Sequence, residues 1–266
     1  MHISRLVSCG GVVHAPYTSS LGYAETVYVD LSEIGHSNCY IVPQAGLYSF
    51  DATVIGNGEY GLVPEVNFHT RDVKIDPKSV ELLWEDKANM ISGLTLDNGE
   101  VKFFSAGVEG NALVAVKDDS GKILWSWHIW VTDQPQEQVY VNNYGTFTML
   151  DRNNGAIRND RGTGEEWRES VGTYYQWGRK DPFVGVSDFS TGTPATVAGA
   201  QMGKAGGQMT TANSIKNPTT FADFKGNWNE TSEEFWGTEK TIYDPCPAGY
   251  RVPYGSEFLP VSYGPD

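Results

Sequence analysis

Apolar and polar residues alternate in the first half of the chain in a way that predicts β-strands. From Tyr48 to Val54 every second residue is apolar and the residues between are polar, as expected for one buried face of a strand. Further along, two pairs of apolar runs are joined by Asp97-Asn-Gly99 and Asp118-Asp-Ser-Gly121, which are typical of β-hairpin turns. We therefore expect residues 24–132 to form an antiparallel β-sandwich.

The pattern changes near residue 133. Residues 133–139 are polar and contain a proline, and we interpret them as a linker. A second unit, residues 140–266, is predicted to open with a strand at 146–150.

One helix is expected in this second unit. Thr163-Gly-Glu-Glu166 resembles a capping box, a sequence that starts helices. The residues after it have helical spacing of apolar and aromatic side chains. One face of the expected helix carries Trp167, Val171, Tyr174 and Tyr175. Gly172 weakens this helix, and Gly178 is its expected end.

Residues 184–217 are rich in Gly, Ser, Thr and Ala and contain few large apolar side chains. This composition predicts a long irregular loop. The whole pattern therefore indicates a mostly β protein with a smaller α+β part.

The N-terminal residues 1–23 are expected to be poorly ordered. Within them, Leu6-Val-Ser-Cys9 has the form of a bacterial lipoprotein cleavage site, but too few residues precede it to form the apolar region of an export signal. Two interpretations stay open: a remnant of a lipoprotein signal, or an ordinary segment of a chain that is incomplete at its N-terminus. The sequence has no run of about 18 apolar residues, so no transmembrane segment is predicted.

Charge and cysteine content narrow the class of protein. The 266 residues carry a formal net charge of −14, so neither a nucleic acid nor an anionic membrane surface is an expected partner. The chain has 3 cysteines and is long enough to bury a large core, so disulfides are not its organising principle. Aromatic residues make up 12% of the chain, which suits strand faces or ring-stacking sites.

Four blocks in the second half carry a resemblance to a known family. The blocks are Met149-Leu-Asp-Arg-Asn-Asn-Gly-Ala156, Tyr174-Tyr-Gln-Trp-Gly-Arg-Lys-Asp-Pro-Phe183, Ser214-Ile-Lys-Asn-Pro-Thr-Thr-Phe221 and Tyr243-Asp-Pro-Cys-Pro-Ala-Gly-Tyr-Arg-Val-Pro253. They resemble the Fibrobacter succinogenes major paralogous domain, which is common at the end of fimbrillin-like surface proteins of Bacteroidetes. In the first half, Ser37-Asn-Cys-Tyr-Ile-Val-Pro43 and Gly110-Asn-Ala-Leu-Val-Ala-Val116 look like the module that precedes this domain.

The resemblance implies a C-type-lectin-like α+β fold for the second unit. Its Gly-Tyr-Arg-Val-Pro stretch followed by Glu257 is similar to a motif of such folds, in which Arg251 is expected to hold a carboxylate bidentately and Pro253 to fix the entry to a helix. Asn154 stands where the family usually has Leu, which we interpret as a local surface change. The family domain continues well beyond Arg-Val-Pro, so the resemblance implies a second domain that is incomplete at its C-terminus.

Candidate chemistry other than ligand binding has simpler structural interpretations. Gly56-Asn-Gly-Glu-Tyr-Gly61 matches a dinucleotide motif, but a turn and strand are expected after it where such a site needs a helix. His36-Ser-Asn-Cys39 offers two metal ligands where a structural zinc needs four. Glu165-Glu166 and Glu233-Glu234 fit a helix start and a solvated face better than paired catalytic acids.

The cysteines are expected to be free. Cys246 lacks an assignable base, so nucleophilic catalysis is not supported. A disulfide between Cys39 and Cys246 is conceivable in an exported protein, but small buried thiols are the simpler interpretation. We therefore expect no catalytic residue, no metal and no cofactor.

Aromatic residues are the best candidates for a binding site. In a strand, Trp125 and Trp127 share one face, which either packs between sheets or stacks on a sugar. Core packing is the favoured use. The block that contains Tyr175, Trp177, Arg179 and Asp181 mixes rings with polar groups in a way that suits glycan or peptide contact, although a structural role is again favoured.

The resulting hypothesis is a non-catalytic cell-surface or secreted bacterial protein that acts in adhesion or in glycan or protein binding. Its expected partner is a glycan or a cell-surface protein. The alternative is a pilin-like structural subunit whose sheet is completed by a partner's strand. A carbohydrate-active or modifying enzyme is less favoured.

Overall fold

A computed structural model describes residues 26–58, 61–63, 68–70, 73–160, 162–184, 186–188, 193–194, 198–199, 203–223, 227–229 and 235–257. The predicted N-terminal segment 1–23 with its Leu6–Cys9 motif lies outside the described residues, as does the Glu233-Glu234 pair.

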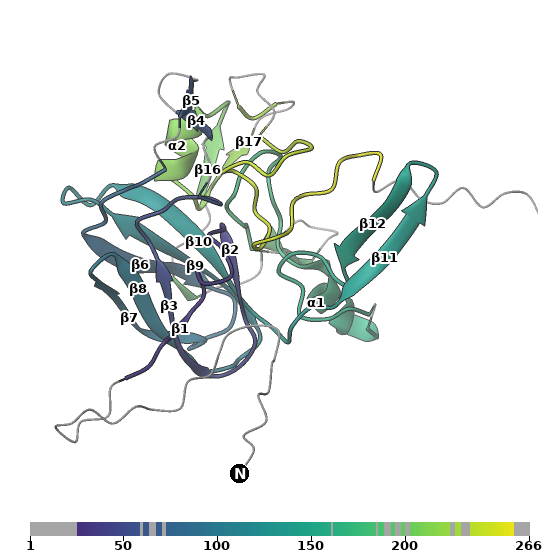
Figure 1. The fold of residues 1–266 in the computed structure, drawn as a ribbon, viewed down its shortest axis with the longest axis horizontal. Helices are drawn as coiled ribbons and strands as arrows, with labels where there is room; N and C mark the ends of the chain where they lie inside the picture. The colour runs from purple at the N-terminus through teal and green to yellow at the C-terminus, as the bar shows by residue number, and fades with distance from the viewer. Residues whose placement is uncertain are drawn as a thin grey trace, which may run out of the picture.

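The chain is mostly β, and two larger sheets contain most strands of its first half together with one short strand of the second (Figure 1). The four-stranded sheet has the order β1-β3-β8-β7, with β1 Val29–Asp30, β3 Gly46–Asp51, β8 Glu100–Ser105 and β7 Ile91–Asp97. The five-stranded sheet has the order β15-β6-β9-β10-β2, with β15 Ala198–Gly199, β6 Ser79–Glu85, β9 Gly110–Lys117, β10 Ile123–Val131 and β2 Cys39–Val42.

Both sheets are mixed, which corrects the expectation of purely antiparallel pairing. Strand β1 runs parallel to β3, and β2 runs parallel to β10. Alternation of apolar residues decides which face of a strand is buried, but it does not decide the direction of the neighbouring strand.

The two sheets bury their side chains in a common core. Phe50 of the four-stranded sheet lies with its ring centroid 5.1 Å from that of Trp127 in the five-stranded sheet, and Tyr40 lies 4.9 Å from Phe50. Phe50 and Trp127 are completely buried. The predicted alternation in β3 is confirmed, since Tyr48, Phe50 and Ala52 all belong to this core.

Both predicted hairpins are present. Strands β7 and β8 are joined by Asn98 and Gly99 with φ of 51° and 87°, the two positive values that a tight hairpin turn needs. Between β9 and β10, the Asp118 carboxylate accepts hydrogen bonds from the amides of Ser120 and Lys122 at 2.9 and 3.0 Å. Local turn chemistry therefore fixes both connections.

Shorter elements follow in the second half. They are β11 Glu137–Asn142, β12 Gly145–Leu150, η1 Gly164–Glu166, α1 Trp167–Val171, β13 Val186–Asp188, β14 Thr193–Pro194, β16 Gly203–Gly206, α2 Thr211–Lys216 and β17 Thr220–Asp223. An additional pair, β4 Gly61–Val63 and β5 Phe68–Thr70, lies within the first half. The β11–β12 hairpin projects on the right of Figure 1, and α2 and β17 lie near its top.

The structure confirms the predicted opening strand and shortens the predicted linker. Strand β12 matches the expected strand at 146–150, and β11 already begins within the expected linker 133–139. The hairpin pairs Tyr140 with Phe147, so both strands form one unit.

The predicted helix is shorter than expected. Half of the expected capping box is present. The Thr163 amide and hydroxyl donate to the Glu166 carboxylate at 2.9 and 3.1 Å, whereas the Glu166 amide donates to the Thr163 carbonyl and not to its hydroxyl. Helix α1 ends at Val171, and Gly172 follows with φ of 78°. Its ψ of −159° lies outside the helical region, so the helix ends there and not at Gly178. A Cβ at residue 172 would lie 2.4 Å from the Asn154 carbonyl oxygen, so the position requires glycine. Tyr174 and Tyr175 consequently lie outside the helix.

The expected irregular loop at 184–217 is also corrected. It contains α2 and several short strands. Thr210 caps α2 by accepting a hydrogen bond from the Asn213 amide at 3.1 Å, and Ile215 buries its side chain in the main core. The buried face of α2 contains only one large apolar side chain, that of Ile215, so the sequence pattern does not reveal the helix.

The two predicted units share one core. Ile215, Phe235, Ile242 and Tyr243 from the second half belong to the same buried cluster as the strands of both sheets. The Asn38 side chain donates hydrogen bonds to the carbonyls of Ile242 and Asp244 at 2.7 and 2.8 Å. Within the described part of the chain, no helix is both long and apolar enough to cross a membrane.

Candidate functional site

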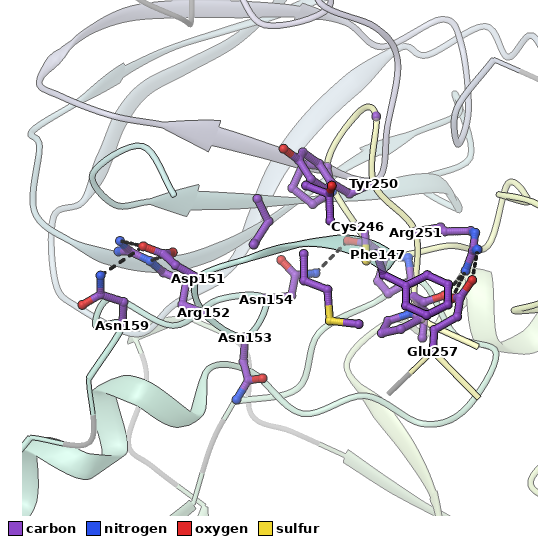
Figure 2. Close-up of a pocket in the computed structure, with 18 of the residues that line it drawn as sticks. Phe147, Asp151, Arg152, Asn153, Asn154, Asn159, Cys246, Tyr250, Arg251 and Glu257 are labelled. Carbon is purple, nitrogen blue, oxygen red and sulfur yellow. Dashed lines mark hydrogen bonds and ion pairs between the residues drawn. The ribbon is translucent and has the colours of Figure 1, made fainter. Parts of the chain in front are cut away.

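A cavity of about 870 Å³ lies between the β11–β12 hairpin, the loop 151–160 and the segment 245–257. We call it the hairpin cavity. Aromatic rings and side-chain amides line it together, including those of Phe147, Tyr175, Trp236, Tyr250, Asn153, Asn154 and Asn159. Figure 2 shows Asp151, Arg152 and Asn159 toward one end and Arg251 and Glu257 toward the other, with Asn154 between them.

The segment 250–257 forms one wall. Arg251 donates two hydrogen bonds to the Glu257 carboxylate at 2.8 and 2.7 Å, which confirms the bidentate role expected for Arg251 (Figure 2). These bonds hold the pKa of Glu257 below its ordinary value. Asn142 of the hairpin donates to the carbonyls of Ser256 and Glu257 at 3.0 and 3.1 Å, so the wall is tied to the hairpin.

The loop 151–160 forms the opposite wall. Arg152 is almost completely buried as a side chain, and its Nε lies 2.8 Å from the Asp151 carboxylate. A second carboxylate, that of Asp133, also pairs with this guanidinium. Arg158 pairs in the same way with Asp160 at 2.7 Å.

The charges of the cavity therefore neutralise one another. Its three arginines lie beside three carboxylates that also line it, those of Asp151, Asp160 and Glu257. A ligand in the cavity meets these groups already paired, so the cavity offers no net charge.

Behind the cavity, a buried hydrogen-bond network connects it to the five-stranded sheet. Asn154 donates to the Tyr175 hydroxyl and to the Pro245 carbonyl at 3.0 and 2.8 Å. The Tyr175 hydroxyl lies 3.3 Å from His128 Nδ1, and His128 Nε2 lies 2.8 Å from the Asn111 side-chain oxygen. Asn154 is thus part of an internal network, which corrects its interpretation as a surface change.

Cys39 and His128 have the residue types of a nucleophile and base but the wrong environment. Cys39 Sγ lies 3.4 Å from His128 Nδ1. Burial raises the pKa of the Cys39 thiol and lowers the pKa of His128 to about 3. A neutral imidazole and a protonated thiol with 1% exposure make a polar contact in the core, not an activated nucleophile.

Comparison of the chain with protein-family models, characterised proteins and solved structures finds no match. The function must therefore be inferred from the site itself.

Four of the predicted site residues are buried in structural roles. Trp125 and Trp127 have exposed fractions of 2% and 0%, which confirms core packing and leaves neither ring available to a surface sugar. Arg179 donates to the carbonyls of Thr220 and Pro218 at 2.6 and 3.2 Å and so holds the connection between α2 and β17. Asp181 accepts a hydrogen bond from Ser126 at 2.6 Å.

The other two predicted residues remain accessible to a ligand. Tyr175 lines the hairpin cavity, and the ring of Trp177 is 44% exposed. Both also line a smaller open hollow of about 340 Å³, together with Phe221 and Trp228. Of the six predicted site residues, Tyr175 alone lines the hairpin cavity.

Most cavity residues were not predicted from the sequence. Phe147, Trp236 and Tyr250 come from three segments that are distant in sequence, and none of them stands in a catalytic motif. The signal that could have found Arg251 and Asn154 was their place in the blocks 243–253 and 149–156.

The remaining motifs are explained by packing. A Cβ at Gly56 would lie 2.6 Å from the Ile242 Cα, so this glycine allows the C-terminal segment to approach and is not part of a nucleotide loop. His36 lies 3.3 Å from the Asp51 carboxylate, whereas Cys39 contacts His128, so the two do not share a ligand. Among the described residues, no three His, Cys, Asp or Glu side chains are grouped to hold a metal ion.

Proposed function

We propose that this chain is a non-catalytic binding protein of the cell surface or of the secreted fraction, and that the hairpin cavity binds a neutral glycan. The observation that carries the proposal is the combination of aromatic rings and amides in a cavity whose charges are internally paired. Sugar rings present apolar faces for stacking and hydroxyls for hydrogen bonds, and this lining offers both kinds of contact.

The size of the cavity supports this ligand class. About 870 Å³ lies within the range of small-molecule sites and suits an oligosaccharide of a few rings. A strongly anionic ligand would have to displace Asp151, Asp160 or Glu257 from its arginine, which costs the paired interaction.

The test is a glycan array probed with the purified chain, followed by titration of the best ligand. Phe147→Ala removes a cavity ring and is expected to weaken binding by about 3- to 10-fold, as the loss of one stacked ring predicts. Tyr144→Ala is the matched control, because this ring is 64% exposed in the same hairpin and does not line the cavity. Absence of any bound glycan, or equal losses in both variants, would overturn the proposal.

A pilin-like structural subunit is the second candidate. It is favoured by the β11–β12 hairpin, whose Val139 and Val141 are 70% and 56% exposed on a two-stranded sheet. Such a sheet can be completed by a strand of another subunit. Concentration-dependent assembly that is lost in Val139→Lys would favour this candidate, and a monomer at all concentrations would count against it.

A specific fold can also be proposed for each half of this β-rich chain. We propose that the two mixed sheets form a β-sandwich and that residues 140–257 form part of a C-type-lectin-like domain of the Fibrobacter succinogenes major paralogous type. The shared core between Phe50 and Trp127 supports the first part, and the four sequence blocks support the second. An experimental structure of the chain tests both.

A further inference from the structure

The hairpin cavity follows the outer edge of β12. Every residue from Thr146 to Leu150 lines the cavity, whereas no residue of β11 does. A cavity over one face of the β11–β12 sheet would take alternate residues from both strands, because successive side chains of a strand point to opposite faces. The lining therefore indicates that the cavity opens along the edge of β12.

The register of the hairpin shows which main-chain groups point to this edge. The Asp151 amide donates to the Gln136 carbonyl at 2.8 Å, so these two residues form a hydrogen-bonded pair. Hydrogen-bonded and non-hydrogen-bonded pairs alternate along an antiparallel ladder. Thr146, Thr148 and Leu150 are consequently the residues of β12 whose N–H and C=O groups point away from β11.

These outward groups have no partner in the described part of the chain. Strand β12 pairs only with β11 there, and no hydrogen bond from another segment reaches the main chain of Thr146, Thr148 or Leu150. Thr146 and Thr148 are also exposed. The edge thus offers a row of N–H donors and C=O acceptors to a ligand.

The side chains of the cavity offer fewer donors, because protein atoms already engage them. The Asn153 amide group donates to two carbonyls of α1 at 3.4 and 3.2 Å, and the Asn159 amide group donates to Asp151 at 3.0 Å. Asn154 bonds within the internal network, and the arginines bond to their carboxylates. The main chain of β12 is therefore the principal open hydrogen-bonding surface of the cavity.

We propose that the hairpin cavity binds a linear neutral oligosaccharide that lies along β12, with its hydroxyls bonded to the main chain of Thr146, Thr148 and Leu150. This binding mode rests on the glycan-binding function proposed above. A hydroxyl both donates and accepts, so it matches an N–H beside a C=O. The row from residue 146 to residue 150 is about 13 Å long, which favours a chain of sugars over a single ring.

An extended peptide also pairs with strand edges, but the ends of this cavity favour a short sugar chain. At one end, Asp151 directly follows β12 and pairs with Arg152. At the hairpin turn, Asn142 donates to the Glu257 carbonyl, and the Glu257 carboxylate pairs with Arg251 (Figure 2). A strand that belongs to a longer polypeptide would have to pass these ion pairs, whereas a free oligosaccharide can end between them.

The test is amide hydrogen exchange of the ¹⁵N-labelled chain, measured by NMR with and without cellotetraose, xylotetraose or maltotetraose. In the free chain the amides of Phe147 and Met149 should exchange slowly, because both pair with β11. A tetrasaccharide that binds should slow the amides of Thr146, Thr148 and Leu150 by at least about 10-fold at saturation. Binding that leaves these three amides unchanged would overturn the proposed binding mode and leave the glycan function intact.

A matched pair of variants separates the main chain from the side chain. Thr148→Pro removes the outward N–H and spares the pairing with β11, since proline is tolerated at such edge positions. It should weaken tetrasaccharide binding about 3- to 10-fold, as one lost hydrogen bond predicts. Thr148→Val keeps the N–H and loses only the hydroxyl, so it should bind as the parent chain does. Equal losses in both variants would contradict the main-chain contact, and slow exchange of Phe147 and Met149 in both shows that the hairpin is intact.

A capped pentapeptide of alternating alanine and valine tests the other occupant. If this peptide slows the amides of Thr146, Thr148 and Leu150 and no tetrasaccharide does, the edge of β12 is a peptide site and the proposed binding mode is wrong. If no tetrasaccharide binds and no probe slows these amides, the binding mode is also wrong, and the glycan array decides separately whether the chain binds any glycan.

Discussion

His128 connects the five-stranded sheet to the wall of the hairpin cavity. Its two ring nitrogens face the Asn111 side-chain oxygen on one side and Cys39 and Tyr175 on the other. Asn111 is held in turn by Asp86, whose carboxylate accepts two of its hydrogen bonds at 2.7 and 2.8 Å. A charged imidazole would lose its solvation here without gaining a carboxylate contact, so the folded state holds it neutral.

Stability should therefore fall as the pH falls. Burial lowers the pKa of His128 from 6.5 to about 3, so the neutral form contributes fully above about pH 6.5 and is progressively lost below it. Between pH 7 and pH 5 the free energy of unfolding should drop by about 2 kcal/mol, as measured by urea denaturation. The variant His128→Gln keeps a polar side chain that does not titrate, and it should remove this drop.

The control is His36→Gln. His36 is half-buried beside Asp51 and lies outside the network, so this variant should retain the pH dependence that comes from His128. A full 2 kcal/mol drop in His128→Gln would show that other groups cause it.

Trp127 and Trp177 differ in burial, and they should therefore differ in how much each contributes to stability. Trp127→Ala removes a completely buried ring that packs against Phe50, and it should lower the free energy of unfolding by about 3–5 kcal/mol. Trp177→Ala removes a ring that is 44% exposed and should cost less than half as much. Denaturant titration of both variants measures the difference, and equal losses would contradict the assigned burial.

At the scale of elements, the end of α1 is fixed by a contact with the cavity loop. Gly172 has φ of 78°, and any Cβ there would meet the Asn154 carbonyl oxygen at 2.4 Å. Gly164 in η1 also has a positive φ, of 57°, but open space surrounds its Cβ position. Gly172 also has ψ of −159°, a backbone conformation that is nearly restricted to glycine, so the two glycines differ in backbone strain as well as in what a methyl group would contact.

This pair makes a matched test. Gly164→Ala should cost about 1 kcal/mol, the price of a left-handed backbone for alanine. Gly172→Ala should cost at least about 2 kcal/mol more, because the clash displaces Asn154 from Tyr175 and Pro245. Faster amide exchange around residues 153–157 should accompany the second change alone. Similar unfolding energies and exchange for the two variants would refute the contact.

Elements defined by local chemistry could be predicted, and those defined by distant partners could not. The turn at Asn98 and Gly99 and the cap at Thr163 use backbone and side-chain groups a few residues apart, so the sequence shows them. The parallel pairing of β2 with β10 joins Cys39 to His128, and nothing near either residue specifies it. Helix α2 was missed because its cap at Thr210 stands among small residues that resemble a loop.

The same distinction explains the site. Alternation puts Trp125 and Trp127 on one face of β10, and their core packing agrees with the favoured interpretation. Both faces of this strand are buried, however, since every residue from Trp125 to Val131 is buried. The hairpin cavity forms where Phe147, Asn154 and Tyr250 come together in the folded chain. Their spacing in the sequence does not predict that they line one cavity.

At the scale of the whole molecule, the two halves are held together by buried polar contacts as well as by apolar packing. Lys180 is buried among the sheet residues and donates to the Ser126 carbonyl at 3.0 Å. Its ammonium lies 4.5 Å from the centre of the Trp125 ring. Asn38 accepts a hydrogen bond from the indole of Trp125 while it donates to Ile242 and Asp244. If one half unfolded alone, the groups that bond across the halves, at Lys180, Ser126 and Asn38, would lose their partners.

We therefore expect the described parts of both halves to unfold in one cooperative step. In native-state hydrogen exchange, the slowest amides of β9 and β10 and those of residues 241–246 should report the same free energy of opening. Asn38→Ala leaves three buried groups without a partner and should lower both values together by about 3 kcal/mol or more. Asn159→Ala, which removes an exposed contact with Asp151, should change neither by more than about 0.5 kcal/mol. If Asn38→Ala loosens residues 241–246 while β9 and β10 keep their protection, the halves unfold separately and the shared core is not what stabilises the molecule.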